Sequence, residues 1–347
     1  MTSSSDAPLL EVRGLRTVFR LADGREAAAV DDISFTIGRG ETLGLVGESG
    51  SGKSVTAMSI IRLVQPPGRI VAGRIHLEGQ ALMDLSEEAM RRIRGRRIGF
   101  IFQEPMVALD PVYTIGAQIA ETLAVHDLAR GAAARARAIE LLEAVRVPDP
   151  ARRAREYPHQ LSGGLRQRAM IALALSAEPA LVVADEPTTA LDVTVQAEIL
   201  DLLRDMRREF HLSLLLITHD LGVVAEMADR VAVMYAGRIV EQAGVHELFA
   251  NPAHPYTRGL LGSIPGTRPG KRLVSIPGNV PALGQLPPGC AYAPRCPHRF
   301  AACAEVPGVS QPWPEHDVRC FLHTDASGSA RPSIAGSSRE RDGEAGA

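Results

Sequence analysis

Residues 47–54 have the residue types and the spacing of a loop that binds phosphate groups. Their sequence, GESGSGKS, fits G-x-x-x-x-G-K-[ST] and lies between an apolar strand pattern, ETLGLVG, and a helical pattern, SVTAMSIIRLV. Glycines let backbone N–H groups curl round phosphates, Lys53 can reach the β- and γ-phosphates, and Ser54 can ligate Mg²⁺. A turn that only caps a helix fits the bare pattern, but the strand–loop–helix context favours a nucleotide site. We expect nucleotide contacts from Gly47, Glu48, Ser49, Gly50, Ser51, Gly52, Lys53 and Ser54.

Two adjacent acids end a second apolar strand pattern, VVADEP, as Asp185 and Glu186. Buried strand ends rarely carry two carboxylates without a cation or a proton-transfer task. We expect Asp185 to hold Mg²⁺ through water and Glu186 to polarise the attacking water. A solvated strand end with two inert acids is the alternative if the pair is considered alone.

Two further motifs are informative mainly through their order along the chain. In LSGGLRQR, Ser162 is a good helix N-cap, and the glycines after it let an anion approach the amide-rich helix start. His219 ends the apolar pattern SLLLITH. Each motif alone is typical of an ordinary cap or a surface histidine.

Strand and helix patterns alternate along the segments that must position these residues. Apolar strands are expected at 97–102, 180–185 and 213–219, and helices at 132–147 and after Ser162. This alternation predicts an α/β domain with a mainly parallel core sheet. Residues 9–38 predict two or three short antiparallel strands around an Asp23-Gly24 turn, and 230–242 predict a hairpin that turns at Ala236-Gly237.

The composition is that of a soluble globular protein. The chain of 347 residues is 45% hydrophobic and 22% charged, with a formal net charge of −2, so nothing global favours nucleic acid or an anionic membrane. The N-terminus lacks the layout of a signal peptide, and the longest apolar stretches fall far short of the ~18 residues of a membrane span. We therefore expect the protein in the cytosol, where thiols stay reduced.

All four cysteines lie near the end of the chain, at Cys290, Cys296, Cys303 and Cys320. The preceding segment, from residue 251, is dense in proline and glycine, which predicts a linker or an extended appendage. The spacing C-x5-C-x6-C-x16-C lacks the close C-x2-C pairs of most zinc sites, so a cubane iron–sulfur cluster suits it at least as well. Beyond His323 the chain is small, polar and aperiodic, and we expect a disordered tail.

The motifs in order resemble those of ABC-type ATPases over about residues 8–250: the phosphate loop, Gln103 in FIFQEP, LSGGLRQR, VVADEP, ALD and ITHD. The resemblance implies a head-to-tail dimer. The signature of one chain, Leu161, Ser162, Gly163 and Gly164, would contact the γ-phosphate on the Lys53 loop of the other. It also implies that Gln103 senses Mg²⁺ and the attacking water, that His219 clamps the γ-phosphate, and that Ala190, Leu191 and Asp192 form the D-loop. Phe19 is the candidate for stacking on adenine, with a strand-core role as the alternative.

Three segments closely resemble the ATP-binding subunits of bacterial oligopeptide and dipeptide importers: residues 102–119, 157–175 and 184–200. Residues 251–265 and the pattern P-G-C-x-[FY]-x-x-R-C-P…C…C are similar to that family's C-terminal extension. The resemblance implies a [4Fe–4S] cluster on the four cysteines, with Zn²⁺ as the alternative and a structural role favoured over a redox one. We divide the chain into an ATPase domain (1–250, helical subdomain about 104–176), an extension (251–323) and a tail (324–347).

The resemblance implies the energy-coupling ATPase of a peptide importer at the cytoplasmic face of the bacterial inner membrane. Its expected partners are a homologous ATP-binding subunit, in a heterodimer rather than a homodimer, two transmembrane permeases and, indirectly, an extracytoplasmic peptide-binding protein. Nickel and glutathione importers share much of the ATPase pattern. A soluble ABC ATPase with a metal module for redox sensing or nucleic-acid work is the alternative from another class. Only 4% of the residues are aromatic, so we expect no nucleic-acid partner.

Overall fold

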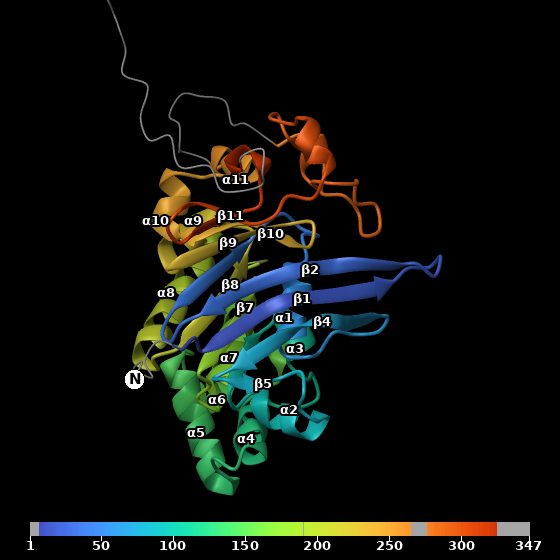
Figure 1. Cartoon of the computed structure of the whole chain (residues 1–347). Helices are drawn as coiled ribbons and strands as arrows, with labels where there is room; N and C mark the ends of the chain where they lie inside the picture. The colour runs from blue at the N-terminus through green and yellow to red at the C-terminus, as the bar shows by residue number, and fades with distance from the viewer. Residues whose placement is uncertain (1–6, 190, 265–275, 325–347) are drawn as a thin grey trace, which may run out of the picture.

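A computed structural model of the chain describes residues 7–189, 191–264 and 276–324, and within them the strands form two sheets (Figure 1). One is four-stranded, in the order β2-β1-β4-β5, and the other is eight-stranded, in the order β11-β12-β10-β9-β3-β8-β7-β6. The strands are β1 (Leu10–Arg20), β2 (Glu26–Ile37), β3 (Thr42–Val46), β4 (Gly68–Leu77), β5 (Gln80–Ala81), β6 (Ile98–Ile101), β7 (Leu181–Asp185), β8 (Ser213–Thr218), β9 (Arg230–Tyr235), β10 (Arg238–Gly244), β11 (Ser310–Trp313) and β12 (His316–Val318).

The helices cover the faces and one end of the larger sheet. They are α1 (Lys53–Ile60), α2 (Glu87–Ile93), α3 (Pro105–Ala108), α4 (Ile115–Val125), α5 (Gly131–Ala144), α6 (Pro150–Arg153), α7 (Gly163–Leu175), α8 (Val193–Glu209), α9 (Leu221–Met227), α10 (Val245–Ala250) and α11 (Pro255–Gly262). Short 3-10 turns occur at Pro158–Gln160, Ala293–Arg295, Ala301–Ala304 and Phe321–His323. Helices α3 to α7 fall within the predicted helical subdomain, and α4 to α6 project from the end opposite the C-terminal segment (Figure 1).

The smaller sheet is antiparallel, as its sequence predicted. Strands β1 and β2 form one long hairpin, in which Arg20 pairs with Glu26 across the Asp23-Gly24 turn. Strand β4 pairs with the other side of β1 and was not predicted. Its alternate residues are largely exposed and it contains Gly73, so it lacks the continuous apolar pattern of a buried strand.

The predicted parallel core is confirmed and carries the chemistry at one edge. Strands β9, β3, β8, β7 and β6 run parallel, with Val46 opposite Thr218 and Asp185 opposite Ile217. Strands β3, β7 and β8 are buried throughout, which explains their apolar runs. Because the carboxyl ends of parallel strands meet at one edge, the segments after Val46, Asp185 and Thr218 are brought together.

The C-terminal segment is more ordered than its proline and glycine content predicted. It begins with helix α11, and its strand β12 pairs with β10 and so extends the core sheet. The carboxylate of Glu241 on β10 is buried and accepts hydrogen bonds from the backbone N–H of Ala253 (2.6 Å) and His254 (2.8 Å) and lies 2.7 Å from His316 Nε2. We expected an irregular appendage. These contacts between distant parts of the chain instead make the segment part of the main fold.

Three tyrosines form the core between the ATPase domain and the extension. The ring centroid of Tyr235 on β9 lies 4.7 Å from that of Tyr256 and 5.2 Å from that of Tyr292. All three are nearly fully buried. The extension therefore shares a hydrophobic core with β9 and β10.

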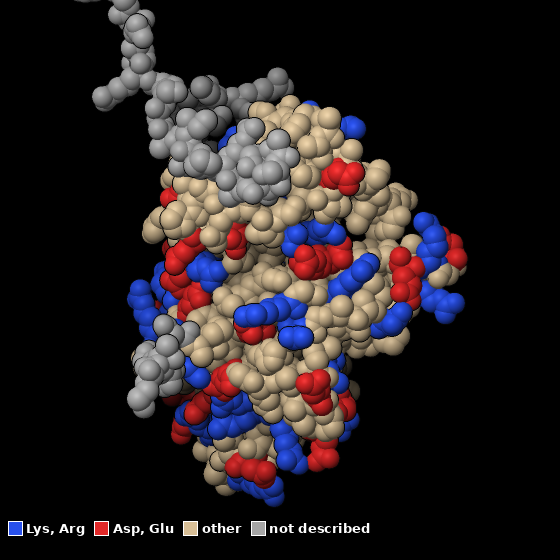
Figure 2. Space-filling model, in the orientation of Figure 1, with Lys and Arg blue, Asp and Glu red and all other residues tan. Residues whose placement is uncertain are grey.

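No helix in residues 7–189, 191–264 and 276–324 is long and apolar enough to cross a membrane. The face shown in Figure 2 carries basic and acidic side chains interspersed, without a continuous stripe of either sign. Except for Thr324, the predicted tail 324–347 lies outside the described residues, as does Ala190 of the predicted D-loop.

Candidate nucleotide site

The phosphate loop connects the buried strand β3 to helix α1. At Gly52 its backbone has a conformation that requires glycine. This residue has φ +102°, and a Cβ there would lie 2.3 Å from the carbonyl oxygen of Ala29 on β2. The loop therefore packs directly on the hairpin strand, and the start of α1 is left open to an anion.

Lys53 lies inside this loop. Its side chain is 5% exposed, and its ammonium donates to the carbonyl oxygens of Gly47 (2.8 Å) and Glu48 (3.1 Å). Burial lowers the pKa of Lys53, while the nearby carboxylates of Glu186 and Asp185 oppose this shift. A poorly hydrated cation at this place is suited to phosphate oxygens, which would replace the carbonyl contacts.

Ser54 and Asp185 meet at the predicted magnesium position. The Ser54 hydroxyl donates to Asp185 Oδ1 over 3.1 Å, across the gap between α1 and the end of β7. Asp185 is 4% exposed, and burial raises its pKa, against the hydrogen bond from Ser54. Hard oxygen donors of this kind fit Mg²⁺, which binds through one or two carboxylates and substrate phosphates.

Glu186 and His219 come together beside this pair. His219 Nδ1 lies 3.4 Å from Glu186 Oε2, and the hydroxyl of Thr189 donates to the same oxygen over 2.8 Å. Glu186 has φ +47°, and its backbone N–H donates to Ile217 O (2.9 Å). A non-glycine residue in the left-handed region is strained, and here the hydrogen bond to β8 holds the carboxylate toward the cavity. No pattern in the sequence singles out Thr189.

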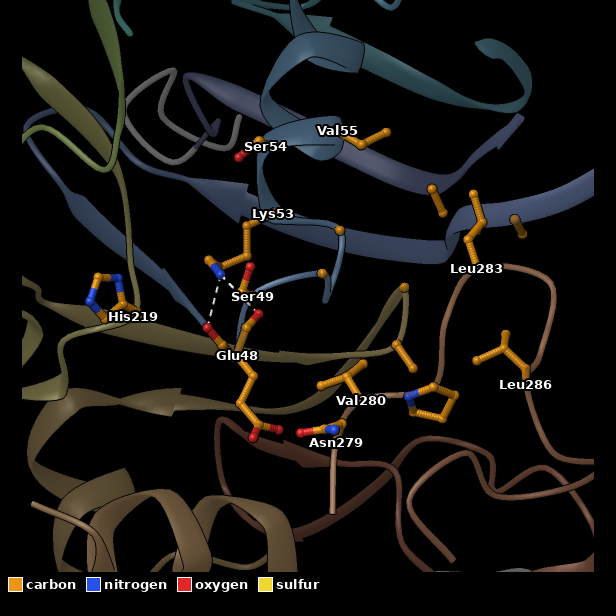
Figure 3. A pocket seen from close by; sticks show the side chains of 18 of the residues that line it. Glu48, Ser49, Lys53, Ser54, Val55, His219, Asn279, Val280, Leu283 and Leu286 are labelled. Carbon is orange, nitrogen blue, oxygen red and sulfur yellow. Dashed lines mark hydrogen bonds between the residues drawn. The ribbon is translucent and has the colours of Figure 1, made fainter. Parts of the chain in front are cut away.

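One cavity of about 870 Å³ joins these groups (Figure 3). It is lined by the phosphate loop and by Gln103, Glu186 and His219, among others. The structure thus brings together the predicted nucleotide residues except Ser51, which is buried beneath the loop, and Phe19. Phe19 is not among the residues that line this cavity, and its ring atoms lie 2.6–2.8 Å from where a Cβ on Gly68 would be.

The signature residues do not line this cavity. Ser162 accepts a hydrogen bond from Leu165 N (3.4 Å) as the N-cap of α7, and it and Gly163 are exposed, while Leu161 is buried. Gly163 and Gly164 lie close to Leu191 and Val195 of the same chain. Asp192 of the predicted D-loop caps α8 by accepting from Val195 N (3.0 Å). These residues therefore lie outside the phosphate site of their own chain.

Two extension residues that sequence reasoning did not assign to the site contact Glu48 of the phosphate loop. The backbone N–H of Glu48 donates to the hydroxyl of Tyr256 (2.9 Å), and Arg295 donates to the Glu48 carboxylate at 2.6 and 3.0 Å. Arg295 stood in the cysteine motif, but no local pattern could place it beside a partner 247 positions away. The extension is therefore in direct contact with the nucleotide site.

The four cysteines line one small cavity of about 10 Å³ in the extension, together with His254 and His298. Burial raises the pKa of Cys290, Cys296 and Cys320, to about 11 for Cys320. No group of three or more His, Cys, Asp or Glu side chains in the described ranges is arranged so that it could hold a metal ion. The thiols thus converge without forming a ready site for a single ion.

Comparisons with known proteins agree with this geometry. Residues 30–189 match the family model described as ABC transporter, and residues 240–303 match the one described as oligopeptide/dipeptide transporter, C-terminal region. A putative peptide import ATP-binding protein of Brucella melitensis is 54% identical over 331 residues, covering 91% of this chain and 98% of that protein. A peptide ABC transporter ATP-binding protein of Sinorhizobium fredii is 51% identical, covering 90% of this chain and 94% of that protein.

Solved structures show the same fold. A dimeric ATP-binding cassette in a post-hydrolysis state with ADP and Pi superposes with a TM-score of 0.61 at 28% identity, covering 68% of this chain and 98% of that one. CbiO1 from Clostridium perfringens, part of the CbiONQ transporter complex, has a TM-score of 0.60 at 28% identity, covering 71% and 92%. The chain therefore belongs to the ABC transporter family, as an ATPase that uses ATP and Mg²⁺. Within that family it is the ATP-binding subunit of a peptide importer.

Proposed function

We propose that the chain hydrolyses ATP with Glu186 as the base for the attacking water and His219 as the contact to the γ-phosphate. The observation that carries this is one cavity lined by Lys53, Ser54, Glu186 and His219, in which Ser54 contacts Asp185 and His219 contacts Glu186. Bound Mg²⁺, held by Ser54 and, through water, by Asp185, would neutralise phosphate charge. Lys53 would hold the β- and γ-phosphates, and Gln103, which lines the same cavity, would sense Mg²⁺ and the attacking water.

Glu186→Gln tests these roles. It keeps the size and the hydrogen bond from Thr189 but removes the basic carboxylate, so hydrolysis should fall by about 10²–10⁴-fold while ATP still binds. Phosphate release and ATP affinity are measured on the same preparation. Unchanged hydrolysis in the variant would contradict the assignment of Glu186.

The second element of the proposal is a head-to-tail dimer with a homologous ATP-binding subunit. It is supported by the exposure of Ser162 and Gly163, and by the absence of the signature residues from the lining of their own chain's cavity. The similar cassette with bound ADP and Pi is itself dimeric. We expect ATP to induce dimerisation of Glu186→Gln with the homologous subunit, measured by light scattering, and Ser162→Arg to prevent it without loss of ATP binding to the monomer. Mixing with the cognate second subunit distinguishes heterodimer from homodimer.

The third element concerns the membrane partners. A peptide-importer ATPase works with membrane permeases, and we propose that the helical subdomain docks on two of them at the cytoplasmic face of the inner membrane. Directly after Gln103, four large apolar side chains are exposed: Met106 (42%), Val107 (77%), Val112 (70%) and Tyr113 (53%). Exposed apolar patches of this kind are typical of protein contacts. Peptide would reach the permeases from an extracytoplasmic binding protein, without contact to this chain.

The fourth element is a metal group on Cys290, Cys296, Cys303 and Cys320, for which we favour a [4Fe–4S] cluster over Zn²⁺. Four thiols on irregular loops around one cavity are a suitable donor set for a cluster. The group would crosslink the extension. Iron and sulfide analysis of protein purified without oxygen, beside Cys303→Ser, tests this. Near-equal iron and sulfide, lost in the variant, supports the cluster, whereas one zinc or no metal overturns it.

A further inference from the structure

A second cavity, of about 750 Å³, lies at the edge of the core sheet opposite the nucleotide site. Its lining includes Gly40, Ala180 and Ser213, which stand before or at the start of β3, β7 and β8. The phosphate loop, Glu186 and His219 follow the other ends of the same three strands. The cavity has the size of a small-molecule site, and a ligand in it would not occupy the position of ATP.

Four arginines line this second cavity. Arg39 comes from the loop between β2 and β3, and Arg204, Arg207 and Arg208 come from the C-terminal part of α8. Among the described residues of the lining, the one acid is Glu226. Guanidinium groups stay charged and bind phosphate oxygens in two-pronged contacts. The side chains of this cavity are therefore suited to an anion that carries phosphate groups.

The loop that carries Arg39 is fixed to the neighbouring helix and strand. Arg207 on α8 donates to the carbonyl oxygen of Gly40 from Nη2 (2.6 Å) and from Nε (3.1 Å). The hydroxyl of Ser213 on β8 donates to the carbonyl oxygen of Gly38 (2.9 Å) and accepts from the backbone N–H of Gly40 (2.8 Å). The backbone around the cavity is thus ordered before a ligand binds, which favours affinity.

The arginines keep donors that a ligand can use. Arg208 is exposed and makes no hydrogen bond or ion pair in the described parts of the chain. The side chain of Arg39 is 65% exposed and donates to Glu78 over 2.9 Å, through Nη2. A guanidinium has more N–H groups than one carboxylate accepts. Exposed ion pairs such as these contribute only about 0–1 kcal/mol, so a ligand with several negative charges can compete with them.

From these contacts we propose that the second cavity binds a small molecule with a diphosphate group. Arg39 and Arg208, which come from different elements, would contact the phosphates, with Arg204 and Arg207 adding positive charge beside them. Four guanidinium groups exceed what a single phosphate can pair with, and the cavity is larger than one phosphate fills. Inorganic pyrophosphate and a nucleoside diphosphate share this chemistry. The proposal goes beyond ATP hydrolysis and does not depend on it.

The test measures how much radiolabelled pyrophosphate the full chain binds in equilibrium dialysis. Lys53→Ala removes the cation of the phosphate loop and should leave a single bound pyrophosphate per chain, in the second cavity. In that background, Arg39→Ala with Arg208→Ala should weaken this binding by at least about tenfold, because charge-assisted contacts are lost. Both replaced side chains are exposed, so the Tm should be retained, and Arg208→Ala alone should give a smaller loss.

The matched control is Arg13→Ala with Arg92→Ala, which removes two exposed arginines that do not line the cavity. It changes the net charge equally and should leave pyrophosphate binding intact. ADP in the Lys53→Ala background distinguishes the two sources of the diphosphate. Binding of ADP that depends on Arg39 and Arg208 and is tighter than that of pyrophosphate supports a nucleotide, and weaker binding supports the inorganic ion.

Three results would overturn the proposal. The Lys53→Ala chain binds no pyrophosphate, the Arg39 and Arg208 variants bind it as tightly as their parent, or the control pair weakens it as much. In the first case, with a lower Tm of Arg208→Ala, the arginine would only offset the negative end of helix α8. A loss confined to the Arg39 and Arg208 variants, with an unchanged Tm, supports the site.

Discussion

Arg295 in the C-terminal extension and Glu48 in the phosphate loop form a two-pronged ion pair, with N–O distances of 2.6 and 3.0 Å. The guanidinium is 6% exposed and the carboxylate 30%. The hydrogen bonds that Arg295 donates to Glu48 raise the pKa of Arg295, against the effect of burial, so the charge is retained. The hydroxyl of Tyr256 accepts a hydrogen bond from the backbone N–H of Glu48. The phosphate loop is thus positioned by the extension as well as by its own strand and helix.

We predict that Arg295→Ala raises the KM for ATP several-fold, with a smaller effect on kcat, because the phosphate loop loses one of its supports. The free energy of unfolding should fall by about 1–3 kcal/mol, since a partly buried carboxylate loses its partner. Arg295→Lys, which retains charge but not the two-pronged geometry, should be intermediate. Steady-state hydrolysis and denaturant unfolding measure these effects.

The matched control is Arg204→Ala, which removes a pair with Glu226 (2.6 Å) on helices α8 and α9, away from the nucleotide cavity. It should leave the KM unchanged. An equal KM for the wild type and Arg295→Ala would mean that the pair only stabilises the fold.

A second prediction concerns Gly52→Ala. A Cβ at this φ of +102° would lie 2.3 Å from the Ala29 carbonyl oxygen, so the loop must move. We expect ATP binding to be lost and the Tm to fall. Gly40→Ala is the comparison, because its φ is +69° but no atom lies within 4 Å of the new Cβ. It should cost only the intrinsic strain of about 1–2 kcal/mol and leave ATP binding intact. Normal ATP affinity in Gly52→Ala would contradict the tight packing of the loop on β2.

A third prediction is a pH-dependent contribution from Glu241. Although burial alone would raise its pKa, hydrogen bonds from His316 and from the N–H groups of Ala253 and His254 hold it below the usual value. Stability from this group is therefore present above about pH 4.5, the ordinary pKa of a glutamate, and is lost as the pH falls through the lower folded value.

Glu241→Gln should destabilise the protein by about 1–3 kcal/mol at pH 7, and this difference from wild type should shrink as the pH falls below about 4.5. Unfolding in denaturant between pH 7 and pH 3 measures it. A difference that is constant over this range would show that the ionisation of Glu241 does not contribute to stability.

A fourth prediction addresses the permease contact. Val107→Asp with Tyr113→Asp should reduce co-purification with the permeases, since two exposed apolar side chains of the proposed docking surface become charged. ATP affinity of the isolated chain should not change. Val309→Asp, on an exposed apolar residue of the extension, is the control. Full permease binding by the double variant would place the contact elsewhere.

Much of the nucleotide site could be predicted because its motifs are local. Lys53, Ser54, Asp185 and His219 each end or follow a buried apolar strand, and parallel strands bring their carboxyl ends together. Contacts between distant segments could not be predicted. Neither the pairing of β12 with β10 nor the position of Arg295 beside Glu48 follows from a periodic pattern, because both depend on how the proline-rich segment packs.

Phe19 illustrates the same limit. Its role in stacking on adenine stays a prediction, because its ring lies against Gly68 and its contact with a base depends on how distant segments pack.

The most direct test of the central claim is ATP-driven uptake of labelled peptide into proteoliposomes that contain the permeases, the chain, its partner ATPase and the peptide-binding protein. We predict uptake that requires ATP and is abolished when Glu186→Gln replaces the wild-type chain, with the complex still assembled. Equal uptake with and without ATP, or with the Glu186→Gln chain, would contradict the role of this site in driving peptide import.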